Sequence, residues 1–80
     1  MLNFHLTIHR GTLYAQSRDA IRIVERDGWF RVRTRGSHRQ YKHQTKPGRV
    51  TIAGQPARDL DPKTWYSILE QAGLDREDYR

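Results

Sequence analysis

Residues 28–53 read GWFRVRTRGSHRQYKHQTKPGRVTIA, and their pattern predicts three short β-strands joined by two turns. Apolar and polar side chains alternate over residues 29–33 and again over residues 49–53, which is the period of a half-buried strand. Residues 37–43 supply a polar and basic strand between them, entered through Gly36, and a Lys-Pro-Gly turn follows it. The three strands are therefore expected to form an antiparallel meander.

A helix is expected on each side of this meander. Before it, Ser17 and Asp19 suit the N-cap and first turn of a helix that stops at Gly28. After it, Asp61 followed by Pro62 is typical of an N-cap and a first helical residue. Apolar residues repeat at helical spacing in both segments, at Ala20, Ile21, Ile23 and Val24 and at Trp65, Ile68, Leu69 and Ala72. The predicted fold is α+β, with the element order αβββα.

The two faces of the predicted sheet differ in chemistry. Helices that connect to both ends of one small sheet must cover one of its faces. Strand alternation places on the covered face Phe30, Val32, Tyr41, Val50 and Ile52. It places on the opposite, open face Trp29, Arg31, Arg33, His38, Gln40, Lys42, Arg49 and Thr51. A one-residue bulge in the second strand would reverse His38 and Tyr41.

Length and composition exclude several classes of protein. The chain has 80 residues, enough for one hydrophobic core, since a chain of this size buries only roughly 60% of its unfolded surface. It has no Cys, which excludes a disulfide framework and a thiolate metal site. The sequence contains no run of about 18 apolar residues, the length that a membrane-spanning helix needs. Residues 1–8 are too short and too polar for the apolar region of a signal peptide, so we expect a cytoplasmic protein.

Residues 1–16 form an N-terminal extension with a pattern of its own. Apolar side chains alternate with polar ones at its start, at Leu2, Phe4, Leu6 and Ile8. Arg10-Gly11 separates this run from a second short one, so a strand or a hairpin is predicted. Two alternatives stay open: the extension adds to a sheet edge or mediates dimerisation, or it is mobile. His5 and His9 lack a third ligand at suitable spacing, so no metal site is expected there.

Positive charge is concentrated in one segment of the chain. The net charge is +6, and all nine acidic residues lie in residues 19–27 or 59–78. Residues 28–58 contain none of them and carry Arg31, Arg33, Arg35, Arg39, Lys42, Lys46, Arg49 and Arg58. A solvated charged face is the simpler explanation. A stretch of this length without a carboxylate nevertheless favours an anionic partner, and we expect it to bind the phosphate backbone of RNA.

The most specific string in the chain is Gly36-Ser37-His38, which enters a strand directly after Arg33-Thr34-Arg35. Gly28-Trp29 precedes it, and residues 64–74 read TWYSILEQAGL. In this arrangement the sequence resembles the HicA family, the mRNA-interferase toxins of bacterial toxin–antitoxin pairs. The resemblance covers residues 17–74 and leaves 75–80 as a C-terminal tail.

The resemblance implies a fold like that of double-stranded-RNA-binding domains, cleavage of RNA without a metal ion or other cofactor, and His38 as the catalytic residue. It also implies neutralisation by a cognate HicB-type antitoxin. The sequence departs from the family pattern in two places. Family members often carry a proline and a histidine just after the third strand, where this chain has Ala53-Gly54-Gln55. They also usually lack the sixteen residues before the first helix.

The residues themselves also indicate cleavage of RNA by proton transfer. RNA carries its own nucleophile, the 2′-hydroxyl, so cleavage needs a base, an acid for the leaving 5′-oxygen and cations for the phosphate. His38 suits both proton transfers, because an unperturbed imidazole titrates near pH 6.5. A second proton donor is not identified, since His43 has the wrong strand parity. Gly36 is expected to shape the turn. We expect the RNA to be bound by Arg31, Arg33, Arg35, Ser37, Arg39, Lys42 and Arg49.

Simpler interpretations of these residues and rival functions stay open beside RNA cleavage by His38. A strand histidine taken alone is more often a surface residue than a catalyst, and Trp29 either stacks on a base or packs at the sheet end. The runner-up function is a non-catalytic RNA-binding module of the double-stranded type. Such domains usually carry a lysine cluster where this chain has Asp61-Pro62-Lys63-Thr64. A third class is a subunit whose basic face binds only an acidic protein.

Overall fold

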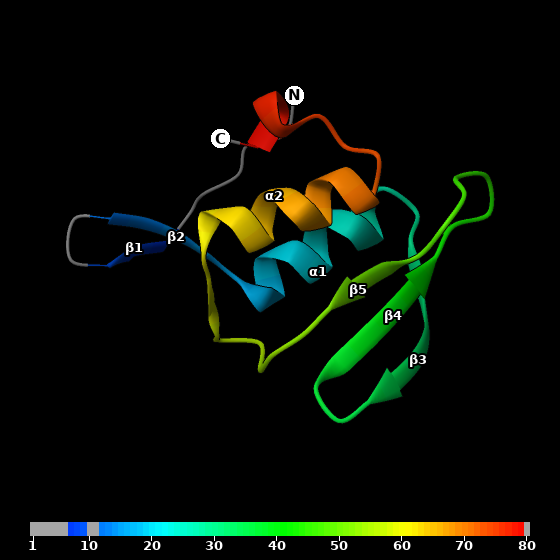
Figure 1. Cartoon of the computed structure of the whole chain (residues 1–80), viewed down its shortest axis with the longest axis horizontal. Coiled ribbons are helices and arrows are strands. Elements are labelled where there is room, and N and C mark those ends of the chain that lie inside the picture. The colour runs from blue at the N-terminus through cyan, green and yellow to red at the C-terminus, as the bar shows by residue number, and fades with distance from the viewer. Residues whose placement is uncertain (1–6, 10–11, 80) are drawn as a thin grey trace.

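The computed structural model describes residues 7–9 and 12–79, and Figure 1 shows its arrangement. The helices are α1 (Ser17–Arg26), α2 (Pro62–Gln71) and the 3-10 turn η1 (Arg76–Tyr79). The strands are β1 (Thr7–His9), β2 (Thr12–Gln16), β3 (Phe30–Arg35), β4 (His38–Lys42), β5 (Val50–Ile52) and β6 (Asp59–Leu60). The segment from α1 through β3, β4 and β5 to α2 confirms the predicted αβββα order and the α+β fold.

Two antiparallel sheets are present in the described part of the chain. The main sheet has the order β3-β4-β5, as expected for a meander. The second sheet has the order β1-β2-β6, in which the β1–β2 hairpin joins the short strand before α2. In Figure 1 this hairpin projects away from the main sheet. The part of the N-terminal strand prediction that concerns residues 1–6 lies outside the described residues.

The core lies between the two helices and one face of the main sheet. Both helices contact β5, which carries Val50 and Ile52 into the core beside Tyr41 of β4. The helices contribute most of the remaining buried apolar side chains, among them Ala20, Ile23, Val24, Trp65, Ile68 and Leu69. The helical spacing seen in the sequence therefore marks the faces that pack on the sheet. The prediction that Trp65 is a core residue is confirmed.

Both helices begin at polar caps. Gln16 is the N-cap of α1, one residue before the predicted Ser17, and its backbone N–H donates to Asp19 Oδ2 at 2.8 Å. Asp61 is the N-cap of α2, as predicted, and its carboxylate accepts a hydrogen bond from the Thr64 N–H at 2.8 Å. This hydrogen bond favours the charged carboxylate, so it lowers the pKa of Asp61. The Ser17 side chain is therefore not used as the N-cap of α1.

β3 differs from the sequence expectation because it contains a β-bulge. The register pairs Arg31 with Tyr41 but Arg33 with Gln40, so β3 has one more residue than β4 in this interval. An extra residue resets the alternation of a strand. Every residue of β3 is exposed, and the predicted burial of Phe30 and Val32 is wrong: their exposed fractions are 48% and 44%. A bulge was considered for the second strand of the meander, whereas it lies in the first, between Arg31 and Arg33.

Trp29 was placed on the open face by strand alternation, and that placement is also wrong. Its side chain is 2% exposed and belongs to the core, and its Nε1–H donates to Asp27 Oδ2 at 3.2 Å. The reason is that β3 begins only at Phe30, so strand alternation does not extend back to Trp29. Of the two alternatives for this residue, packing at the sheet end is the correct one.

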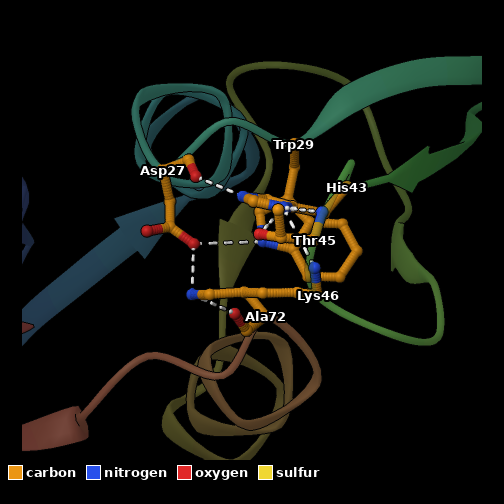
Figure 2. Close-up of polar contacts among 6 residues, drawn as sticks. All are labelled: Asp27, Trp29, His43, Thr45, Lys46 and Ala72. Carbon is orange, nitrogen blue, oxygen red and sulfur yellow. Dashed lines mark hydrogen bonds and ion pairs between the residues drawn. The ribbon is translucent and has the colours of Figure 1, made fainter.

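A polar cluster joins the C-terminal ends of both helices to the loop between β4 and β5, as Figure 2 shows. Lys46 in this loop forms an ion pair with Asp27, the C-cap of α1. The same ammonium group donates to the carbonyl of Ala72, the C-cap of α2, at 3.1 Å. A cation at two helix C-termini meets the negative ends of both helix dipoles. Lys46 therefore holds the loop against the two helices.

His43 belongs to the same cluster and has a defined tautomer. Its Nδ1 accepts hydrogen bonds from the backbone N–H groups of Thr45 and Lys46, at 3.1 and 3.2 Å. That nitrogen therefore carries no proton, and Nε2–H donates to the carbonyl of Asp27 at 2.6 Å. A Cβ on Gly28 would lie 2.8 Å from Nε2. Gly28 is thus required both by its φ of +99° and by its closeness to this ring.

We predict that Gly28→Ala destabilises the fold more than Gly48→Ala does. Both glycines have left-handed backbones, at φ +99° and +79°, which cost roughly 1–2 kcal/mol for a residue with a side chain. Only the Gly28 substitution also displaces the His43 ring, because a Cβ on Gly48 would meet nothing within 4 Å. Denaturant unfolding of both variants measures the difference. Equal losses of unfolding free energy would contradict the close contact at Gly28.

Candidate nucleic-acid interface

The open face of the main sheet is defined by its cross-strand pairs. Arg35 is opposite His38, and Gln40 is opposite both Arg33 and Thr51. Residues directly opposite each other in antiparallel strands place their side chains on the same face. These five residues line one shared hollow of about 210 Å³. We use the term open face for the surface formed by Phe30, Arg33, Arg35, His38, Gln40, Lys42, Arg49 and Thr51.

His38 is the first residue of β4 and is exposed on this face. Tyr41, three residues further along β4, lies on the opposite side of the strand and is 1% exposed. Burial raises the pKa of the Tyr41 hydroxyl above its ordinary value. The predicted orientations of His38 and Tyr41 are therefore correct. The bulge in β3 leaves the alternation of β4 intact, so the histidine faces solvent and the tyrosine faces the helices.

A tight turn presents His38. Gly36 and Ser37 connect β3 to β4, and Arg35 pairs directly with His38. Gly36 has φ +59°, and a Cβ there would meet nothing within 4 Å, so the turn requires its conformation rather than its small size. The Ser37 carbonyl accepts a hydrogen bond from the Gly54 N–H at 3.2 Å. The loop after β5 therefore lies beside the turn that carries His38.

The exposed cations of the open face come from all three parts of the hairpin region. Arg33 and Arg35 lie on β3, Lys42 ends β4, and Arg49 precedes β5. The Arg49 guanidinium donates to Gln40 Oε1 at 2.9 Å, which orients the amide of Gln40 within the hollow. A sheet face with four cations and no carboxylate among its residues is suited to a chain of phosphates.

Two of the arginines expected to contact RNA lie elsewhere. Arg31 is paired opposite Tyr41, on the side of the sheet that the helices cover, because the bulge shifts it away from the face of Arg33. Arg39 is half-buried, and its guanidinium donates to the carbonyl of Gly54 at 2.8 Å and, more weakly, to that of Ser37 at 3.4 Å. Its position thus ties the loop after β5 to the turn before β4.

The loop after β5 also binds the start of α1. Ser17 donates through its hydroxyl to the Ala53 carbonyl at 3.0 Å and through its N–H to the Arg58 carbonyl at 2.9 Å. The Arg18 N–H donates to the Pro56 carbonyl at 2.9 Å. The loop therefore accepts hydrogen bonds from two N–H groups at the start of α1 that have no partner within the helix, those of Ser17 and Arg18.

Three residues of the open face carry no sequence signal for a role in RNA binding or cleavage. Gln40 and Thr51 were placed there by alternation, but polar uncharged strand residues carry no functional signal by themselves. Phe30 was placed on the wrong face. No residue type in FRVRTR marks the bulge, so only the pairing with β4 reveals where Phe30 points.

Within the described ranges, no three His, Cys, Asp or Glu side chains gather closely enough to hold a metal ion. The same part of the chain contains no helix that combines the length and the apolar character needed to cross a membrane.

Comparison with models of protein families matches residues 17–74 to the HicA toxin of bacterial toxin–antitoxin systems. The match covers more than half of the chain and includes α1, the main sheet and α2. A search of curated proteins found no match.

Proposed function

The chain belongs to the HicA family of bacterial toxins, and from this premise we propose that it is an mRNA interferase, an endoribonuclease that blocks translation by cleaving mRNA without a metal ion. The observation that carries the proposal is the open face. It presents an exposed imidazole, His38, on a surface with four cations and no carboxylate. A surface suited to an anionic substrate and a group capable of proton transfer thus lie together, which supports the proposal.

The proposed reaction uses the nucleophile that RNA supplies. The 2′-oxygen bonds to the adjacent phosphorus, the bond from phosphorus to the 5′-oxygen breaks, and the products carry a 2′,3′-cyclic phosphate and a 5′-hydroxyl. His38 takes the proton from the 2′-hydroxyl and returns one to the leaving 5′-oxygen, so that a single imidazole serves as base and then as acid. No net proton is gained or lost.

The cations supply the electrostatic part of this reaction. Arg35 is opposite His38, and Arg33 is one pair further along the sheet. Guanidinium groups bind phosphate through two parallel hydrogen bonds and keep their charge at neutral pH. We propose that these two residues stabilise the charge that develops on the phosphate. Lys42 and Arg49 would bind neighbouring phosphates and align the strand.

The runner-up function, a non-catalytic module of the double-stranded type, has less support. Its phosphate grip would need cations at the start of α2. The N-cap there is Asp61, whose carboxylate already binds Thr64 through both the backbone N–H and the hydroxyl. A negative charge at this position opposes phosphate binding.

A cognate antitoxin is the second proposed partner. Membership of a toxin–antitoxin family implies that an antitoxin exists, and we propose a HicB-type protein that covers the open face and His38. Charge complementarity would make the association fast and sensitive to salt. We expect expression of this chain alone to arrest growth and co-expression of the antitoxin to relieve the arrest. Normal growth and intact mRNA in cells that contain the folded protein alone would contradict the toxin role.

We predict that His38→Ala abolishes cleavage while the fold and RNA binding persist. Loss of a general base typically costs about 10² to 10⁴ in rate. The side chain is exposed, so its truncation leaves no core cavity, and substitutions at such positions usually change stability by less than about 0.5 kcal/mol. Cleavage of a transcript in EDTA, with melting and RNA-binding curves, measures the three effects. A His38 variant that cleaves like the wild type would refute the mechanism, and cleavage that stops in EDTA would indicate a metal site.

His43→Ala is the matched control for this test. It removes the hydrogen bonds to the Asp27 carbonyl and from two backbone N–H groups of the loop. Buried or half-buried polar groups left unpaired cost about 1–3 kcal/mol. The variant should therefore unfold more easily and still cleave RNA when folded.

We predict that the logarithm of RNA affinity falls against the logarithm of salt concentration with a slope of roughly −3 to −4, as contact with four or five phosphates requires. Arg33→Glu with Lys42→Glu should weaken binding and flatten the slope, without unfolding the protein. Arg22→Glu with Lys63→Glu changes the net charge by the same amount on the helices and should change the slope less. A wild-type slope weaker than about −1 would remove the role of the open face.

A further inference from the structure

Phe30 lies on the open face with its ring exposed. It is paired opposite Lys42, which is two residues from Gln40 on β4 and therefore on the same face. The side chain of Tyr41, between them, points the other way and is buried. Phe30 is 48% exposed and starts β3 directly after the buried Trp29. The aromatic ring is thus displayed on the surface that carries His38.

The surroundings of Phe30 distinguish it from an ordinary exposed apolar residue. Single apolar side chains on a surface are common and need no explanation. This one is bordered by cations, because Lys42 lies opposite and Arg33 follows on the same face beyond the bulge. Three cross-strand pairs succeed one another along the open face: Arg35 with His38, Arg33 with Gln40, and Phe30 with Lys42. Positive charge beside an exposed ring suits a ligand that carries both phosphates and flat bases.

The spacing along β4 also suits a nucleic-acid strand. His38 and Lys42 lie four positions apart on β4, which corresponds to about 13 Å at the rise of an antiparallel strand. The ring of Phe30 therefore stands at one end of the open face and the imidazole at the other. An RNA strand that follows the cations between them would place a phosphate near His38 and a base, a short distance along the chain, over Phe30.

We propose that Phe30 is a base-stacking residue and that the open face accepts unpaired RNA. This inference rests on the proposed function, since it names the substrate class of the same site. A ring can stack only on a base whose flat face is free, and bases inside a duplex stack on each other instead. Phe30 fixes the position of the strand relative to His38, and a duplex is a poorer ligand than a loop or a single strand.

The test is a double-mutant cycle between Phe30 and one base. The probe is a short single-stranded RNA that the wild type binds, with its 2′-hydroxyls methylated so that no cleavage occurs. One base at a time is removed, and affinity is measured for the wild type, Phe30→Leu and Phe30→Tyr. Stacking of one base on an aromatic side chain is worth about 1–3 kcal/mol, which corresponds to a change of about 5- to 150-fold in affinity.

We expect removal of the base at one position to weaken binding by the wild type within this range. Phe30→Leu keeps an apolar side chain without a ring, so it should bind the intact RNA less tightly and be insensitive to the loss of that base. Phe30→Tyr should behave like the wild type. Val32→Ala is the matched control, because Val32 is 44% exposed in the same strand but lies at the bulge without a partner in β4. It should leave the affinity unchanged.

Other outcomes separate this inference from the proposed function. If Phe30→Leu binds and cleaves RNA as the wild type does, while His38→Ala does not cleave, the stacking role is wrong and the nuclease stands. If Phe30→Leu binds RNA normally but loses affinity for the antitoxin, Phe30 is a protein contact and the stacking role is again wrong. Tighter binding of a duplex than of a single strand would overturn the substrate class. A wild type that binds no RNA would overturn both proposals.

Discussion

The number of helices limits how much of the main sheet can be covered. Two helices of ten residues each cover one face of β3-β4-β5, and they do so mainly over β5, which is buried at Val50 and Ile52. The sheet extends beyond them, so β3 is exposed along its whole length. Among residues 7–9 and 12–79, no element covers the other face. Since carboxylates are also absent from residues 28–58, the uncovered face becomes the basic surface of the molecule.

The two histidines of the hairpin region show how position on the sheet separates a structural role from a proposed chemical one. His43 is surrounded by backbone groups, and its hydrogen bonds to the loop and to α1 hold it in one tautomer. Together with Lys46 it joins the loop between β4 and β5 to both helices. His38 is exposed beside arginines. An imidazole that already donates and accepts within the fold is committed to the structure, whereas an exposed one can exchange protons with a ligand.

The arginines of the hairpin region also separate into those with a structural role and those that face the proposed substrate. The bulge in β3 determines part of this separation. It turns Arg31 to the covered side while it leaves Arg33 and Arg35 beside His38. The same irregularity brings Phe30 to the open face. Arg39 binds backbone carbonyls next to the turn that carries Ser37, so its charge contributes to holding the site in shape. One extra residue in a strand therefore determines which cations and which aromatic ring face the proposed substrate.

Local patterns in the sequence determined the αβββα order, the burial of Tyr41, Val50 and Ile52, and the exposure of His38, because helical spacing, strand alternation and turn residues act over a few positions. The sequence did not determine where Trp29, Phe30, Arg31 and Arg39 would lie. The bulge exists only in the pairing of β3 with β4, and the Gly54 carbonyl that binds the Arg39 guanidinium lies fifteen residues further along the chain. These positions depend on contacts between segments that are distant in the chain, and such contacts are decided by the tertiary structure alone.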